Sequence, residues 1–199
     1  MPSQGGQADE VLHGMSAARG SRAQALMGKV SQGATLFRLE SDQALVQAFR
    51  PRDRRLIEMP AEVRFPHFVR DYLVWTETSG ARVYLVFGEP GTRRPVGVIF
   101  RRDAQPSQEP GANMCDWCHT FGSNLEVGLM TVEVTSRRRA GMYLCRDLRC
   151  KDKVEDAADR AGRHPLEAFQ RLNARIFQFA QEVLGIEAGV PQPAPSAGQ

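Results

Sequence analysis

The chain has 199 residues, of which 42% are hydrophobic and 25% charged, and its formal net charge is +3. This length is enough to bury one main core, and the small charge excess does not by itself indicate a nucleic-acid binder. No apolar run approaches the roughly 18 residues of a membrane span, and the first residues lack the basic-then-apolar layout of a secretory signal. We therefore expect a cytoplasmic protein whose thiols stay reduced.

The two ends of the chain have compositions that disfavour a packed core. Residues 1–34 are rich in Gly, Ser, Gln and Ala and contain few large apolar side chains, so we expect a mostly disordered segment. Residues 188–199 contain three prolines and are expected to form a disordered tail. Folding is therefore expected to concentrate between these two segments.

Residues 35–66 are expected to form a helical region followed by a linker. The apolar positions from Leu36 to Phe49 suit an amphipathic helix, with Ser41 or Asp42 able to cap its second half. The arginine- and proline-rich stretch 50–66 then indicates a solvated connection that leads into the main domain.

Residues 67–187 form the expected main domain. Its first half holds short β-prone runs separated by turn residues, which make antiparallel hairpins the simplest connection. The expected strands are residues 72–75, 81–87, 96–101, 125–135 and 142–144. A loop over residues 103–113 connects the third strand to the first pair of cysteines.

The end of this domain has the pattern of two helices. A charged, alanine-containing segment over residues 147–161 predicts the first, which Gly162 ends. Pro165 opens a longer helix, because proline is tolerated at a first helical position. Apolar side chains then recur at three- and four-residue steps up to Leu184, which predicts one face packed on the sheet, and Gly185 is the expected C-cap.

All four cysteines fall into two short pairs. Cys115 and Cys118 form a C-x2-C pair, Cys145 and Cys150 form a C-x4-C pair, and the chain between them is long enough for one β-hairpin. This spacing is typical of a closed tetrahedral zinc site. Because cysteine occupies all four positions, no position remains for a catalytic water, and we predict one structural Zn²⁺ ion.

The residues beside the cysteines suit a zinc–thiolate centre. Arg146, Arg149 and Lys151 stand within or next to the second pair, where they can offset the negative charge of four thiolates around Zn²⁺. Trp117, inside the first pair, is expected to pack over that loop and to keep water from the sulfurs. The metal is thus expected to have a structural role.

Two alternatives remain open from the spacing alone. His119 follows Cys118 directly and can replace one sulfur as a ligand. The C-x-x-C pair can also carry redox chemistry, but such a pair needs an exposed thiol at a helix N-terminus, whereas a Pro/Gly loop precedes Cys115.

The order of cysteine loop, β-hairpin, cysteine loop and helix is that of a treble-clef zinc finger. Residues 114–120, 127–130 and 141–150 resemble the C-terminal treble-clef domain of the elongation-factor-G-binding proteins, a family that includes the fusidic-acid resistance proteins. The most specific part is the Tyr-x-Cys-x-Asp-Leu-x-Cys run that begins at Tyr143. The resemblance extends from about Tyr72 to Gly185, and the region up to Arg70 shows no match.

This resemblance implies a fold, a metal and a partner. The fold is α+β: a treble-clef zinc finger embedded in a small antiparallel sheet domain with a packed C-terminal helix, preceded by a short helical or disordered N-terminal region. The implied partner is elongation factor G, the ribosome or both, with possible RNA contact, and neither a membrane nor a small-molecule substrate. The implied zinc positions are the four that the spacing selects, Cys115, Cys118, Cys145 and Cys150.

A basic run supplies the candidate partner-binding residues. From Arg137 to Lys153 there are seven basic side chains and two acidic ones, and because both ends of the run meet at the metal we expect them to share one face. Such a face suits an acidic protein surface or ribosomal RNA. Tyr143 either packs the hairpin, which we favour, or presents an aromatic anchor. The candidates are Arg137, Arg138, Arg139, Tyr143, Arg146 and Arg149.

The motifs of common enzyme classes do not occur in the sequence. It has no G-x-x-x-x-G-K loop, no H-E-x-x-H pair and no G-x-S-x-G. We therefore expect a non-enzymatic zinc protein that docks on elongation factor G or the ribosome and modulates translation. The alternative is a nucleic-acid-binding zinc-finger regulator that uses the Arg137–Lys153 run.

Overall fold

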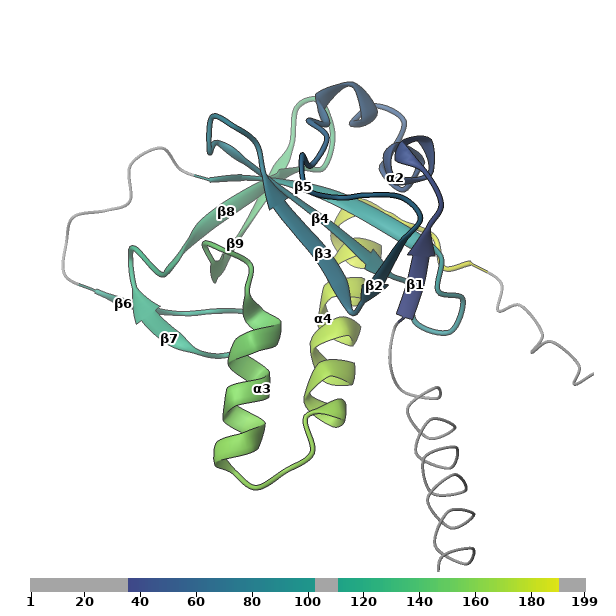
Figure 1. Ribbon diagram of the computed structural model, residues 1–199. Coiled ribbons are helices and arrows are strands. Elements are labelled where there is room, and N and C mark those ends of the chain that lie inside the picture. Colours follow the sequence, from purple (N-terminus) through teal and green to yellow (C-terminus); the bar gives the residue numbers. More distant parts are fainter. Residues whose placement is uncertain (1–35, 103–110, 190–199) are drawn as a thin grey trace, which may run out of the picture. The chain divides into compact units, whose positions relative to one another are not determined.

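The computed structural model describes residues 36–102 and 111–189 (Figure 1). The expectations for residues 1–34, for the loop residues 103–110 and for the tail from residue 190 therefore lie outside the described residues. The fold of the described residues is α+β, as predicted, with antiparallel sheets and helices that follow them.

A five-stranded antiparallel sheet forms the centre of the described fold, in the order β3-β4-β5-β8-β9. The predicted hairpins are confirmed, because β3 pairs with β4, β4 with β5, and β8 with β9. The strands β5 and β8 pair at one end of β5, where Arg101 lies opposite Thr131 and Arg102 lies opposite Met130. The strand bounds are β3 Tyr72–Thr76, β4 Arg82–Gly88, β5 Pro95–Arg102, β8 Val127–Glu133 and β9 Arg139–Cys145.

Both faces of this sheet are covered, so its central strands are apolar on both sides. On β4, Val83, Leu85 and Phe87 belong to one hydrophobic core, and Tyr84 and Val86 belong to another. This follows from the two-residue period of a strand, which sends neighbouring side chains to opposite faces. A continuous apolar run such as the one in β4 is what a strand buried on both faces requires.

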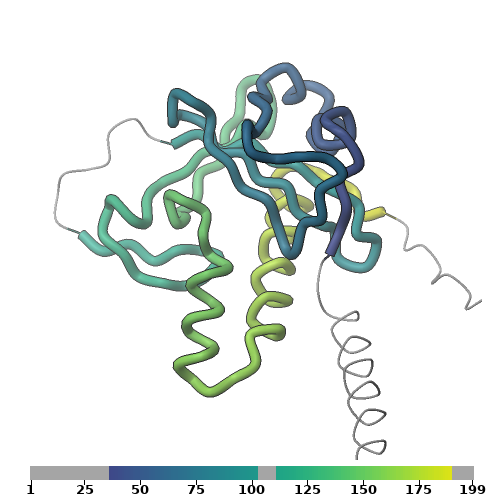
Figure 2. The backbone as a smooth tube through the Cα atoms, in the orientation of Figure 1, coloured from purple at the N-terminus to yellow at the C-terminus, as the bar shows by residue number. Residues whose placement is uncertain are grey.

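The first face is covered by the C-terminal helices α3 (Cys150–Arg160) and α4 (Leu166–Leu184). In Figure 2 they are the green and yellow-green runs, joined by a short turn. Leu172, Ile176 and Ala180 of α4 lie in the same core as the cysteines, as the apolar period predicts. Gly162 and Gly185 both adopt positive φ, at 63° and 65°, where the two helices end.

The second face is covered by the segment that precedes β3. It contains β1 (Leu36–Leu39), α2 (Asp42–Gln47), the 3-10 turn η1 (Arg54–Leu56) and β2 (His67–Arg70), and β1 pairs with β2.

The expectation of one helix over residues 36–49 is wrong in its first half. Leu36 to Leu39 alternate between exposed and buried, which is the strand period. Helix α2 starts only after Ser41, whose hydroxyl accepts the Ala44 N–H at 3.2 Å.

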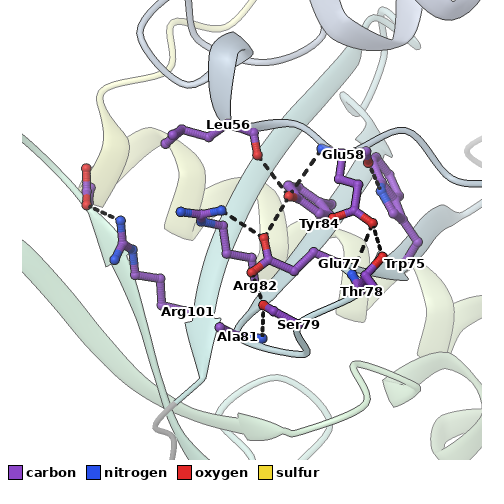
Figure 3. A network of polar contacts seen from close by, with 11 residues as sticks. Leu56, Glu58, Trp75, Glu77, Thr78, Ser79, Ala81, Arg82, Tyr84 and Arg101 are labelled. Atoms are coloured by element: carbon purple, nitrogen blue, oxygen red, sulfur yellow. Dashed lines mark hydrogen bonds and ion pairs between the residues drawn. The ribbon is translucent and has the colours of Figure 1, made fainter.

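The stretch after α2 is mostly exposed, as its composition indicates, but hydrogen bonds and aromatic packing attach it to the sheet. The Tyr84 hydroxyl donates to the Leu56 carbonyl oxygen at 2.8 Å and accepts the Glu58 N–H at 3.2 Å (Figure 3). The Trp75 ring stacks on Tyr84 with centroids 5.0 Å apart, and its Nε1 donates to the Glu58 carbonyl oxygen at 2.7 Å. Two aromatic side chains of the sheet thereby provide hydrogen-bond partners for backbone groups of this segment.

Two short strands frame the first cysteine pair. β6 (Ala112–Met114) pairs with β7 (Phe121–Ser123) in an antiparallel ribbon that the sequence analysis did not predict. The end of the expected loop 103–113 is thus strand from Ala112 onward. This ribbon places Cys115 and Cys118 in the turn between its two strands.

Candidate metal centre

The first cysteine loop is shaped by backbone hydrogen bonds between its two ends. The Cys115 N–H donates to the Thr120 carbonyl oxygen at 3.0 Å, and the His119 N–H donates to the Cys115 carbonyl oxygen at 2.9 Å. His119 completes the turn with a φ of 59°. Its side chain is exposed and is not part of the cysteine cluster, so the alternative in which it replaces a sulfur is not supported.

The second cysteine loop joins β9 to α3. Cys145 is the last residue of β9, and Cys150 is the first residue of α3. Between them the Leu148 N–H donates to the Cys145 carbonyl oxygen at 2.9 Å, and Leu148 has a φ of 52°. The tight turn brings the two sulfurs of the pair toward the first loop.

The four sulfurs form one cluster in which all lie within 4.8 Å of one another. The Sγ atoms of Cys115 and Cys150 are 3.7 Å apart, and those of Cys118 and Cys145 are 3.5 Å apart. A disulfide requires about 2.05 Å, whereas zinc–sulfur bonds of about 2.3 Å give a tetrahedron with edges of about 3.8 Å. The spacing of the sulfurs therefore fits one tetrahedral zinc ion.

The protonation of the thiols also depends on a cation. Hydrogen bonding with Cys115 lowers the pKa of Cys118 and raises the pKa of Cys150. Four clustered thiols therefore do not ionise together unless a positive charge lies among them. The ammonium of Lys153 supplies part of it, since its Nζ lies 3.2 Å from the Cys145 sulfur. Zn²⁺ would supply the rest and displace the remaining protons.

A buried tyrosine that the sequence analysis missed supports the second loop. The Tyr72 hydroxyl donates to the Leu148 carbonyl oxygen at 2.7 Å and accepts the Lys151 N–H at 2.9 Å. It thereby satisfies one of the free N–H groups in the first turn of α3. Burial raises the pKa of Tyr72, so the hydroxyl stays protonated and can donate. Sequence could not reveal this role, because 76 residues separate Tyr72 from Leu148.

Trp117 anchors the first loop in the core, which modifies the expectation that it packs over the loop. It is 2% exposed, and its ring contacts Phe100 and Phe179 edge to face, with centroids 5.6 Å and 6.3 Å apart. The Trp117 carbonyl oxygen accepts a hydrogen bond from the Arg175 guanidinium on α4. The loop is thus attached to both the sheet and the long helix.

Comparisons with known proteins agree with this geometry. The family model described as the FBP C-terminal treble-clef zinc-finger matches residues 42–186. The chain belongs to this family. The match begins at Asp42, the first residue of α2, so the expectation that the region up to Arg70 lies outside the resemblance is wrong for residues 42–70. Because the family and the cysteine cluster agree, the chain holds one structural zinc ion.

One solved structure and the curated proteins complete the comparison. The structure of the fusidic acid resistance protein FusC is similar to this chain at 15% sequence identity and a TM-score of 0.45, covering 82% of this chain and 67% of that one. No curated protein matches the chain. Within the described residues, no helix is long and apolar enough to cross a membrane.

The structure separates the predicted basic run into two parts. Arg137 and Arg138 lie in the turn between β8 and β9, and Arg139 is the first residue of β9, opposite Glu133. The six residue steps from Arg139 to Cys145 in an extended strand span about 20 Å. The expectation that the whole run shares one face is therefore wrong, because only the residues that follow Tyr143 adjoin the cysteines.

The side chains around the cysteine loops are exposed and partly apolar. Tyr143 is 44% exposed, which contradicts the interpretation that it packs the hairpin. Phe121, which the sequence analysis did not select, is 69% exposed. We call the following set of exposed residues the knuckle face: Met114, Phe121, Leu129, Tyr143 and Arg149. Arg146 is half-buried, and its side chain lies beside Gly128.

Strand pairing joins the members of the knuckle face. Met114 lies opposite Phe121, and Leu129 lies opposite Tyr143. Two hydrogen bonds connect the two pairs, since Asp116 donates its N–H to the Tyr143 carbonyl oxygen and accepts the Tyr143 N–H on Oδ2, both at 2.8 Å. The exposed apolar side chains therefore project from one continuous piece of backbone structure.

Proposed function

We propose that this chain is a non-enzymatic zinc protein of the cytoplasm whose knuckle face docks on elongation factor G. The supporting observation is the exposure of Phe121 and Tyr143 beside the metal centre. Large aromatic side chains that are exposed together on one surface are typical of protein-binding sites, where they supply most of the binding energy. The family resemblance is what points to elongation factor G as the partner.

The metal centre fixes the conformation of this face before a partner binds. The cysteine cluster and the Asp116–Tyr143 hydrogen bonds fix the backbone from which the aromatic side chains project. A fixed surface loses little conformational entropy when a partner binds, which favours affinity. With four sulfur ligands the zinc has no open position for a substrate or a catalytic water, so a structural role is the role that its ligand set favours.

A basic depression beside the second loop can add an electrostatic contact. A cavity of about 640 Å³ adjoins Cys145, and Arg102, Arg146 and Lys153 line it together with the acidic Glu126 and Asp147. The excess of one positive charge, and the exposed Leu125 at the same cavity, suit an acidic side chain of the partner flanked by apolar atoms. The aromatic residues would supply affinity, and this depression would supply orientation.

Such a protein acts through binding energy. A partner that contacts one conformation of a translation factor better than another shifts the factor toward the contacted conformation. The same contacts can weaken or strengthen the hold of the factor on the ribosome. In this proposal the chain modulates translation without transforming a substrate.

The proposal is tested by titrating purified elongation factor G with the zinc-loaded chain. The double substitution Phe121→Ala and Tyr143→Ala is expected to weaken binding by at least about thirtyfold, corresponding to roughly 2 kcal/mol. The control is Phe68→Ala on β2, a phenylalanine with a similar exposure of 63% that lies outside the knuckle face. Absence of binding by the unaltered chain, or equal weakening by the control, would contradict the proposal.

A further inference from the structure

Arginines from three distant parts of the chain meet at the β8–β9 turn. Arg101 of β5 and Arg139 of β9 both pair with the Glu133 carboxylate, at N–O distances of 3.0 and 3.8 Å. Figure 3 labels Arg101 and draws its ion pair as a dashed line. Arg50 and Arg52 donate to the Glu133 carbonyl oxygen at 2.6 and 2.7 Å. With the two arginines of the turn they form what we call the arginine surface: Arg50, Arg52, Arg101, Arg137, Arg138 and Arg139.

The acidic residues of this surface do not neutralise it. Asp53, which is buried, pairs with Arg50 at 2.6 Å and with Arg52 at 3.6 Å, and among the described residues Glu133 is the other acid that forms ion pairs with this cluster. Six guanidinium groups and two carboxylates leave an excess of four positive charges. The nearby ion pair of Arg82 with Glu77 adds no net charge. The surface is therefore strongly basic although the chain as a whole is nearly neutral.

The guanidinium groups of Arg50 and Arg52 are held in place before any partner binds. Arg52 donates to two carbonyl oxygens, of Glu133 and Val134, both at 2.7 Å. The turn itself is fixed, because the Thr135 hydroxyl accepts the N–H groups of Arg137 and Arg138 at 3.3 and 3.1 Å. Each guanidinium has five N–H donors, so the bonds of Arg50 and Arg52 orient their guanidinium groups and leave donors for a ligand, whereas the bonds to Thr135 fix the backbone that carries Arg137 and Arg138.

The composition of the surface indicates which ligand it suits. All six cations are arginine, whose planar fork matches phosphate oxygens. No large exposed hydrophobic residue of the described part of the chain lies at residues 50–52, at Arg101 or in the stretch 133–139, and the exposed Leu129 and Tyr143 lie four residues further along β8 and β9. A protein partner usually requires an apolar or aromatic anchor, and a single-stranded nucleic acid requires aromatic side chains for stacking. A duplex phosphate backbone requires neither.

We propose that the arginine surface binds the phosphate backbone of double-stranded RNA. The choice of RNA over DNA rests on the proposed function, since elongation factor G works on the ribosome, which is built largely of RNA. Strand β9 places the arginine surface about 20 Å from the cysteines at its other end. The chain can therefore hold the factor through the knuckle face and contact duplex RNA through the arginine surface at the same time.

The test measures the affinity of the zinc-loaded full chain for a 20-base-pair RNA duplex at several salt concentrations. The variant combines Arg137→Ala with Arg138→Ala, two exposed turn residues whose backbone bonds remain. The matched control combines Arg160→Ala with Arg163→Ala, which removes the same charge from the exposed end of α3 and the turn after it. The variant is expected to bind RNA about tenfold more weakly, with a salt slope smaller by about 2 because each phosphate contact contributes about 0.9. The control is expected to change affinity less than twofold.

Several results would overturn the proposal. They are unchanged RNA binding by the variant, equal loss in the control, equal affinity for a DNA duplex of the same sequence, and tighter binding of polyglutamate than of RNA. Binding of elongation factor G is measured in parallel. The Arg137→Ala and Arg138→Ala variant is expected to retain it, and the Phe121→Ala and Tyr143→Ala variant is expected to retain RNA binding, so failure of one proposal is distinguishable from failure of the other.

Discussion

The two faces of the central sheet are stabilised in different ways. On the first face, Cys115, Cys145 and Cys150 lie in the same core as the apolar residues of α4, so a metal centre and a helix close that side together. On the second face, β1, β2 and α2 close the core through aromatic packing and hydrogen bonds to Tyr84 and Trp75. Each cysteine loop buries one large apolar side chain, Trp117 or Leu148, and the metal adds a direct link between the two loops.

Removal of a zinc ligand is expected to have the largest effect, and to act on the first face. Cys150→Ser should abolish stoichiometric zinc and unfold the two cysteine loops, because structural zinc contributes roughly 10 kcal/mol or more to the folding of small zinc fingers. Zinc content and hydrogen exchange of residues 114–121 measure this. Cys118→His is the control, since three sulfurs and one imidazole also form a structural zinc site. Full protection of residues 114–121 in zinc-free Cys150→Ser would show that packing alone holds the first face.

An added methyl group at Gly97 is expected to disturb the second face alone. A Cβ at this position would lie 2.5 Å from the Phe49 ring, so Gly97→Ala must displace a buried aromatic side chain. We expect a loss of about 1–3 kcal/mol in the free energy of unfolding, with unchanged zinc content. The measurement is denaturant unfolding of the zinc-loaded protein.

The double variant Gly97→Ala with Phe49→Leu tests the assigned cause. If the clash with Phe49 is responsible, the two substitutions together cost less than the sum of the single ones. Strict additivity would contradict this explanation. Loss of zinc from Gly97→Ala would show that the two faces are not independent.

A smaller effect on the first face is expected from Tyr72→Phe. The substitution keeps the ring but leaves the Leu148 carbonyl oxygen and the Lys151 N–H without their buried partner. A loss of about 1–3 kcal/mol follows, together with weaker zinc retention against a chelator. Tyr143→Phe is the matched control, because that hydroxyl belongs to an exposed side chain and should matter little. Equal effects of the two substitutions would refute the role assigned to Tyr72.

The smallest effect is expected at acid pH from Glu89, which is buried at the β4–β5 turn. Burial alone would raise the pKa of this carboxyl, but hydrogen bonds from Thr92, Gly189 and Arg94 outweigh it and lower the pKa below 4.5. Because the pKa is lower in the folded state, the ionised carboxylate stabilises the fold above about pH 4.5. This contribution disappears as the pH falls toward the folded-state pKa.

Glu89→Gln isolates this contribution. The variant should be less stable than the wild type at neutral pH, and the difference should shrink below about pH 4.5. Zinc release at low pH affects both proteins and therefore cancels in the comparison. A difference in the free energy of unfolding that stays constant from pH 7 to pH 3 would contradict the lowered pKa.

The sequence predicted local features better than contacts between distant segments. The cysteine spacing identified the zinc site, and the apolar period identified α4 with Gly185 at its end, because each depends on residues close in the chain. Residues 36–39 were predicted as helix because leucine suits either state, and pairing with β2 decides in favour of a strand. The arginine- and proline-rich composition of residues 50–66 correctly indicated an exposed stretch, but it did not reveal the hydrogen bonds that attach this stretch to Tyr84 and Trp75.

The candidate binding residues show the same limit. Tyr143 and Arg149 were selected because they neighbour the cysteines in sequence, whereas Phe121 begins β7, a strand too short to give a period. The arginines from 137 to 149 were grouped because they are close in the chain. The hairpin carries Arg137 to one of its ends, where Arg50 and Arg101 join it from elsewhere. The register in which strands pair decides which residues lie together in the knuckle face and in the arginine surface. A single sequence does not reveal that register.

Hydrogen exchange of the zinc-loaded chain with and without elongation factor G tests the central claim most directly. The claim is that the factor docks on the knuckle face. The predicted result is added protection in residues 114–121 and 143–149, with residues 36–56 unchanged. Protection confined to residues 36–56, or no change anywhere at saturating factor, would contradict it.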